Sequence, residues 1–184
     1  MTCRSPVIVS QDAIVTMHAA GTAALPSETG GILIGFRTED QVVVTRAIVV
    51  ADEGSSRRSY VRRERRAQRA LTHVLESAPS VAGYIGEWHT HPADQPPSRT
   101  DIESLEQIAA AASDLVALIV LPFEAGEPRP PHAYVGARQR ADSLQRRRRI
   151  RTWSTPIAMV SASADELELS ADAAQLESKE PDQP

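Results

Sequence analysis

The sequence predicts a single α+β domain in which a central mixed β-sheet is flanked by helices. Three observations predict this fold class. Short β-rich runs recur along the chain, stretches with helical periodicity separate them, and 184 residues are enough for one proper hydrophobic core. Hydrophobic residues make up 41% and charged residues 24%, as in an ordinary globular protein.

The first third of the chain predicts a strand, a helix and a hairpin. Residues 6–9 (PVIV) are typical of a short strand, and Ser10 or Asp12 could cap a helix that runs to about Ala20. Pro26 ends that region. The β-rich runs 32–35 (ILIG) and 41–50 (QVVVTRAIVV) are separated by RTED, which predicts two strands joined by a turn.

The middle of the chain predicts a helix followed by a strand that ends in two histidines. Residues 51–59 form a polar loop, and 60–77 are predicted helical because their apolar positions fall on one side. The segment 81–92 (VAGYIGEWHTHP) is predicted as a strand. Pro92, Pro96 and Pro97 then prevent regular structure until Ser98.

Ser98 and Asp101 have the S-x-x-D form of a helix start, so Ser98 could cap a helix over 102–113 with Asp101 in its first turn. The continuous apolar run 115–123 predicts a buried strand, and 132–139 predicts another. The basic stretch 137–153 gives no clear structural signal. We expect one domain over residues 1–160.

Composition sets further limits. From Ser163 onward the chain has seven acidic residues and one basic residue, so we expect 161–184 to be an acidic, flexible tail. The lone Cys3 excludes an internal disulfide and a thiolate zinc site. Neither a signal peptide nor a membrane span is apparent, so we expect the protein to act in the cytoplasm.

One cluster of residue types predicts metal chemistry. His89 and His91 are separated by one residue on a predicted strand, so their imidazoles point to the same face and can bind one ion. Asp101 is the natural third ligand. Zinc bound by two histidines and one carboxylate keeps a fourth position for water and acidifies that water.

Three motifs together resemble a known family. The run ETGGILIGF beginning at Glu28, then GEWHTHP, then PSRTD, resembles the JAMM/MPN+ zinc isopeptidases, and more narrowly their prokaryotic JAB group. The resemblance extends from about Glu28 to about Phe123. It implies an MPN-type fold, one zinc per chain on His89, His91 and Asp101, Glu28 as general base, and Ser98 as a stabiliser of the oxyanion. The interval from His91 to Ser98 is one residue shorter than the family pattern.

The resemblance also implies a substrate class. We expect a zinc-dependent isopeptidase that hydrolyses the amide at the C-terminus of a ubiquitin-like or conjugated protein modifier, as in bacterial antiphage deconjugation. An activating or conjugating enzyme from the same operon is a possible partner. Two alternatives stay open: a non-catalytic MPN-like scaffold of a conjugation complex, and a peptidase that processes a sulfur-carrier protein.

Other residues have competing interpretations. Glu87 lies on the same strand face as the two imidazoles and rivals Glu28 as base, although we favour it as a residue that orients a histidine or faces a partner. Trp88 points to the opposite face and is expected in the core. The Arg-rich segments near 57–69 and 146–149 favour a solvated surface over a nucleic-acid site, because Glu64 interrupts them and stacking aromatics are lacking.

Overall fold

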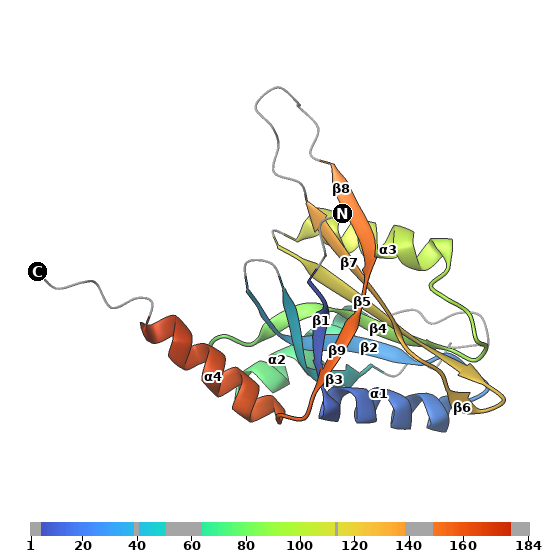
Figure 1. Cartoon of the computed structure of the whole chain (residues 1–184), viewed down its shortest axis with the longest axis horizontal. Coiled ribbons are helices and arrows are strands. Elements are labelled where there is room, and N and C mark those ends of the chain that lie inside the picture. Colours follow the sequence, from blue (N-terminus) through green and yellow to red (C-terminus); the bar gives the residue numbers. More distant parts are fainter. Residues whose placement is uncertain (1–4, 39–40, 51–63, 113, 139–148, 178–184) are drawn as a thin grey trace, which may run out of the picture.

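The computed structural model describes residues 5–38, 41–50, 64–112, 114–138 and 149–177. Its centre is a curled, mixed, nine-stranded sheet with the order β8-β7-β5-β4-β2-β3-β1-β9, with β6 paired to β5 (Figure 1). The strands are β1 (Val7–Ser10), β2 (Gly30–Arg37), β3 (Val42–Val49), β4 (Gly83–His91), β5 (Val116–Glu124), β6 (Glu127–Pro128), β7 (His132–Arg138), β8 (Ile150–Thr155) and β9 (Ile157–Val160). The helices are α1 (Gln11–Ala24), α2 (Glu64–Leu75), α3 (Arg99–Ala111) and α4 (Ala164–Glu177). The predicted fold class is confirmed.

The elements predicted for the first third of the chain are confirmed. Ser10 is the N-cap of α1, and its hydroxyl accepts a hydrogen bond from the amide of Ala13. Strands β2 and β3 form the expected antiparallel hairpin. At Gly31 a Cβ atom would lie 1.8 Å from the carbonyl oxygen of Ile48, so this position of the hairpin has room only for glycine.

Helices cover both faces of the sheet. Helix α1 packs on one face, where Met17 and Trp88 belong to the largest core cluster, and α3 lies on the opposite side (Figure 1). On that second face, Ile32 of β2 packs with α2, whereas Leu118 of β5 packs with α3. Strand β4 lies between β2 and β5, so its residues on this face lie between the two helices.

Residues that bear on the metal prediction sit at the end of β4 and the start of α3. Glu87 is paired with both Ile32 and Leu118, so it shares the second face with His89, two residues further along the strand. The chain then leaves β4 at His91, crosses a proline-containing loop and enters α3 at Arg99. One strand end and one helix start therefore meet at the same edge of the sheet.

The C-terminal prediction is wrong where the structure describes it. Residues 164–177, expected to be flexible, form α4, which lies against β3. The carboxylate of Glu168 is fully buried, accepts a hydrogen bond from the hydroxyl of Thr45, and forms an ion pair with Arg46 at 3.0 Å. The hydrogen bond and the ion pair connect α4 to β3. Residues 178–184 of the expected tail lie outside the described residues.

Three strands were not predicted from the sequence, one of them the two-residue β6, which pairs with β5 in a segment expected to be a loop. Although the basic stretch 137–153 gives no clear structural signal, β8 begins within it and extends the sheet beyond β7, and β9 pairs in parallel with β1. The predicted loop 51–59 and most of the Arg-rich positions lie outside the described residues. In the described part of the chain, none of the helices has the length and apolar character needed to cross a membrane.

Candidate metal centre

Three side chains that could bind a metal converge at the end of β4. His89 Nε2 lies 3.2 Å from His91 Nε2, and these two nitrogens lie 3.3 and 3.4 Å from the two carboxylate oxygens of Asp101. Both imidazoles are almost buried, with 9% of each residue exposed, while Asp101 is partly exposed. The structure thus brings together the two histidines from the strand and the aspartate from the helix.

The spacing of these atoms fits a tetrahedral ion. Two ligand atoms that each lie about 2.0–2.1 Å from zinc at a tetrahedral angle are separated by about 3.3 Å. The two imidazole nitrogens are 3.2 Å apart, and each lies at a similar distance from a different oxygen of the Asp101 carboxylate, 3.3 Å for His89 and 3.4 Å for His91. Two imidazoles and one carboxylate are also a donor set that zinc accepts in hydrolytic sites. The residues present therefore fit a zinc ion.

A backbone carbonyl orients His91. Its Nδ1 lies 3.1 Å from the carbonyl oxygen of Gln95, and because that oxygen can only accept, Nδ1 carries the hydrogen and Nε2 offers its lone pair. Burial lowers the pKa of His91, but the hydrogen bonds that the protonated imidazole donates to Asp101 and Gln95, with the charges of Asp101 and Glu28, outweigh burial and raise the pKa above its ordinary value. The loop between β4 and α3 thus fixes the tautomer.

Asp101 is fixed by the start of its own helix. Ser98 and Asp101 form a reciprocal capping box: the backbone N–H of Ser98 donates to Asp101 Oδ2 at 2.6 Å, and the N–H of Asp101 donates to Ser98 Oγ at 3.2 Å. Burial raises the pKa of Asp101, yet its bonds to His89, His91 and Ser98 outweigh burial and hold the pKa well below its ordinary value. The carboxylate is therefore ionised and aimed at the imidazoles.

Glu28 lies in the segment between α1 and β2, beside the histidines. The next residue, Thr29, donates its N–H to the Thr90 hydroxyl at 3.0 Å, and the N–H of Thr90 donates to the Thr29 carbonyl at 2.8 Å. These bonds attach the segment to β4 between the two histidines. Glu28 is half-buried, and its negative charge is one of the causes that raise the pKa of His91.

Ser98 caps helix α3, and this role is compatible with its predicted role as a donor to the oxyanion. Its hydroxyl oxygen accepts the helix-capping bond, as the S-x-x-D pattern predicted. A hydroxyl has two acceptor positions and one donor, so accepting this bond leaves its O–H able to donate. The side chain is exposed at the entrance of α3, next to Asp101. The capping bond therefore leaves the O–H of Ser98 available as a donor.

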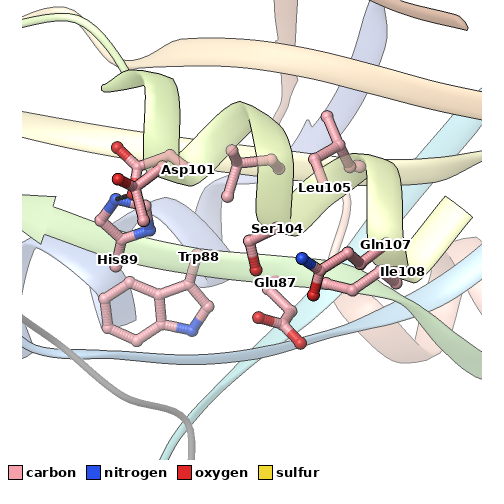
Figure 2. Close-up of a pocket in the computed structure, with 11 residues that line it drawn as sticks. Glu87, Trp88, His89, Asp101, Ser104, Leu105, Gln107 and Ile108 are labelled. Atoms are coloured by element: carbon pink, nitrogen blue, oxygen red, sulfur yellow. Dashed lines mark ion pairs between the residues drawn. The ribbon is translucent and has the colours of Figure 1, made fainter.

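Glu87 and Trp88 take opposite sides of β4. Trp88 is fully buried in the core cluster that includes α1, which confirms its predicted place. Glu87 is half-buried and accepts a hydrogen bond from the hydroxyl of Tyr84 at 3.2 Å. Figure 2 shows His89 and Asp101 turned toward one another at one end of a pocket, with Glu87 further along it, between them and Gln107.

Two supporting residues were missed. Nothing in the sequence singles out Gln95, because its contact with His91 uses the backbone carbonyl, which every residue has. Thr90 is buried, and its hydroxyl bonds the segment that carries Glu28. Its signal was available, since a threonine at a buried strand position needs a hydrogen-bond partner.

Comparisons with known proteins decide the family. A family model described as prokaryotic homologs of the JAB domain matches residues 10–153. The chain belongs to this family. The match covers every strand from β2 to β7, and it includes the histidines of β4 and the aspartate of α3.

Individual relatives agree with this assignment. An Escherichia coli protein named CD-NTase/cGAS isopeptidase is 29% identical over 117 residues, which cover 62% of this chain and 75% of that protein. A probable metalloprotease of Sinorhizobium fredii is 31% identical over 117 residues, which cover 59% of this chain and 70% of that protein. A solution structure from Desulfitobacterium hafniense shares the fold at 17% identity, with a TM-score of 0.61 over 85% of this chain and 94% of that one.

Proposed function

We propose that this protein is a zinc-dependent isopeptidase. Its reaction is hydrolysis of the amide that joins the C-terminus of a protein modifier to an amine of a target. The observation that carries the proposal is the convergence of His89, His91 and Asp101 at tetrahedral spacing, with the carboxylate of Glu28 held beside them. The names of its relatives, an isopeptidase and a metalloprotease, support the same reaction class.

Each residue has a distinct task in this proposal. His89, His91 and Asp101 hold the zinc ion, which when bound would acidify a water molecule and polarise the scissile carbonyl. Glu28 accepts a proton from the attacking water and later delivers it to the amine nitrogen as the carbon–nitrogen bond breaks. Ser98 donates its hydroxyl hydrogen to the carbonyl oxygen as negative charge develops there.

The complete donor set favours an enzyme over a scaffold. A non-catalytic JAB-type module has no need to keep three ligands at metal-binding spacing with a nearby carboxylate. The centre also opens into a pocket rather than being enclosed by protein. A catalytic zinc site keeps a position for water and substrate, whereas a structural site is closed by protein ligands.

The substrate is proposed from the relatives. Because one relative is named as an isopeptidase of CD-NTase/cGAS proteins, we propose that the modifier is an enzyme of that kind conjugated through its C-terminus, and that the reaction belongs to antiphage defence in the cytoplasm. A second substrate, a sulfur-carrier protein whose C-terminus is trimmed, is the alternative within the same chemistry. The two differ in whether the bond lies after the modifier's final residue or within its tail.

The test uses a defined conjugate. A CD-NTase from the same genome, joined through its C-terminal carboxyl to the ε-amine of a lysine peptide, is incubated with the zinc-loaded protein, and the products are weighed by intact mass spectrometry. We expect release of the peptide and recovery of the unmodified C-terminus. Zinc-stripped protein and Glu28→Gln serve as controls and should leave the conjugate intact.

Three results would change the account. Full cleavage by zinc-stripped protein contradicts zinc dependence. Full cleavage by the Glu28→Gln variant would show that Glu28 is not the general base. Cleavage within the tail of a sulfur-carrier protein, with the conjugate left intact, identifies the alternative substrate.

A further inference from the structure

A cavity of about 370 Å³ adjoins the proposed metal centre and has no part in the chemistry described above. It starts at His89 and Asp101, lies over β4 and β5, and is bounded by α3 (Figure 2). Its volume falls within the range of about 300–1,000 Å³ that is usual for ligand pockets. A substrate bound at the metal centre can therefore place a side chain in it.

The wall of this cavity is amphipathic. Leu105, Ile108 and Leu118 provide apolar surface along its length. Polar groups gather beyond Asp101 along the cavity, where Figure 2 shows the polar ends of Glu87, Ser104 and Gln107 near one another. An apolar wall with polar acceptors at one end matches a side chain that has a hydrocarbon stem and a polar head.

The charge of the lining is acidic. Among the described residues that line the cavity, Glu87 contributes a carboxylate that is not a proposed metal ligand, and the lining includes no lysine or arginine side chain. The hydroxyl of Tyr84 donates to Glu87 at 3.2 Å and so fixes the direction of that carboxylate while adding no charge. A cationic head suits this lining better than a neutral or anionic one, because charge-assisted hydrogen bonds are stronger than neutral ones.

Distance selects a long side chain. Residues two apart on a strand are separated by about 6.6 Å, so Glu87 lies roughly that far along β4 from the ligand His89. A substrate residue whose backbone is at the metal centre reaches Glu87 only through a side chain of several methylene groups. Arginine and lysine have such side chains, and the planar head of arginine can bond both the Glu87 carboxylate and the Gln107 amide oxygen.

We infer that this cavity is a specificity pocket for an arginine beside the scissile amide, with Glu87 as the residue that selects its charge. The inference rests on the proposed function only in naming the bound molecule as a substrate. The side-chain stem packs along Leu118 and Ile108, and the guanidinium lies among Glu87, Ser104 and Gln107.

Binding of a single amino-acid probe tests this directly. The zinc-loaded full chain, labelled with ¹⁵N, is titrated with Nα-acetyl-arginine amide and with Nα-acetyl-citrulline amide, a neutral probe of nearly the same shape. We expect the arginine probe to shift the resonances of Glu87, Ser104 and Gln107 and to bind about tenfold more tightly than the citrulline probe, as the loss of a charge-assisted bond predicts.

Two variants locate the effect. Glu87→Gln should reduce arginine binding to the citrulline level. Glu106→Gln removes a carboxylate from the exposed surface of α3, outside the cavity lining, and should leave arginine binding unchanged. Equal binding of the two probes to the wild-type protein overturns the inference without any variant. An equal loss in Glu87→Gln and Glu106→Gln also overturns it, because the general negative charge of the surface would then explain the binding.

The outcome separates this inference from the proposed function. Cleavage of the conjugate combined with equal binding of the two probes rejects the arginine pocket and leaves the isopeptidase standing. Selective arginine binding combined with no cleavage of any conjugate rejects the isopeptidase and leaves the pocket standing.

Discussion

Ser98 is proposed to act both as a helix cap and as a donor to the developing oxyanion, and substitution can separate these roles. The capping role depends on one bond, the 3.2 Å contact from the N–H of Asp101 to Ser98 Oγ. The reciprocal 2.6 Å bond uses the backbone N–H of Ser98 and survives any substitution except proline. Replacing a serine N-cap by alanine costs about 0.5–2 kcal/mol, whereas replacing it by glycine costs only about a few tenths.

The structure places the cost near the middle of this range. Since Ser98 is exposed and the reciprocal bond remains, we expect Ser98→Ala to lower the free energy of unfolding by about 1 kcal/mol, and so to lower Tm by about 2–4 °C. Ser98→Gly should lower Tm by about 1 °C at most. Both variants lack the hydroxyl, so both should lose about 10²–10³-fold in kcat.

The assay combines thermal unfolding with cleavage of the conjugate, each at full zinc occupancy. Ser98→Thr keeps the hydroxyl that serves both roles and is the matched control. We expect it to have a Tm near that of the wild type and measurable turnover. If Ser98→Gly keeps kcat within a few-fold of wild type, Ser98 is a cap alone and its role at the oxyanion is refuted.

Three further predictions concern Glu28, His91 and Glu168. Glu28→Gln should retain zinc, measured by elemental analysis, and lose about 10²–10⁴-fold in kcat with every substrate because the base is gone; loss of turnover for all substrates in Glu87→Gln, with Glu28→Gln active, would reverse the two assignments. Zinc affinity, measured by competition with a chromophoric chelator over about pH 5.5–8, should fall as the pH is lowered through the raised pKa of His91, because a proton competes for Nε2 while Asp101 stays ionised; an affinity independent of pH contradicts this. Glu168→Gln should lower the free energy of unfolding by about 1–3 kcal/mol in thermal or denaturant melts, because the buried partner of Thr45 and Arg46 loses its charge; an unchanged Tm, matching that of the exposed control Glu106→Gln, would show that this contact does not hold α4.

The sequence was informative where local chemistry determines structure. The hairpin of β2 and β3, the buried strand β5 and the cap of α1 all follow from short patterns of apolar, turn and capping residues. The convergence of His89 and His91 follows from strand alternation alone. Asp101 was placed in the first turn of α3 because Ser98 and Asp101 form a recognisable helix start.

The missed elements depend on contacts between distant residues. Helix α4 is held by Glu168 against Arg46, more than a hundred positions earlier, and a buried acid in an acidic stretch has no local signature. One local signal was overlooked: Ser163 and Glu166 form the same reciprocal cap as Ser98 and Asp101. Strand β8 mixes polar and charged residues and follows a run of arginines, whereas β9 is apolar but has only four residues and comes directly after Pro156.

The account depends most directly on one metal ion at the end of β4. Crystals of the zinc-loaded protein can be used to test this. Anomalous diffraction recorded on either side of the zinc absorption edge locates the zinc ions. We predict one peak per chain, about 2.0–2.1 Å from His89 Nε2, His91 Nε2 and a carboxylate oxygen of Asp101, and no peak in Asp101→Ala. A zinc-loaded crystal with no peak among these three residues, or with an undiminished peak in Asp101→Ala, would contradict the account.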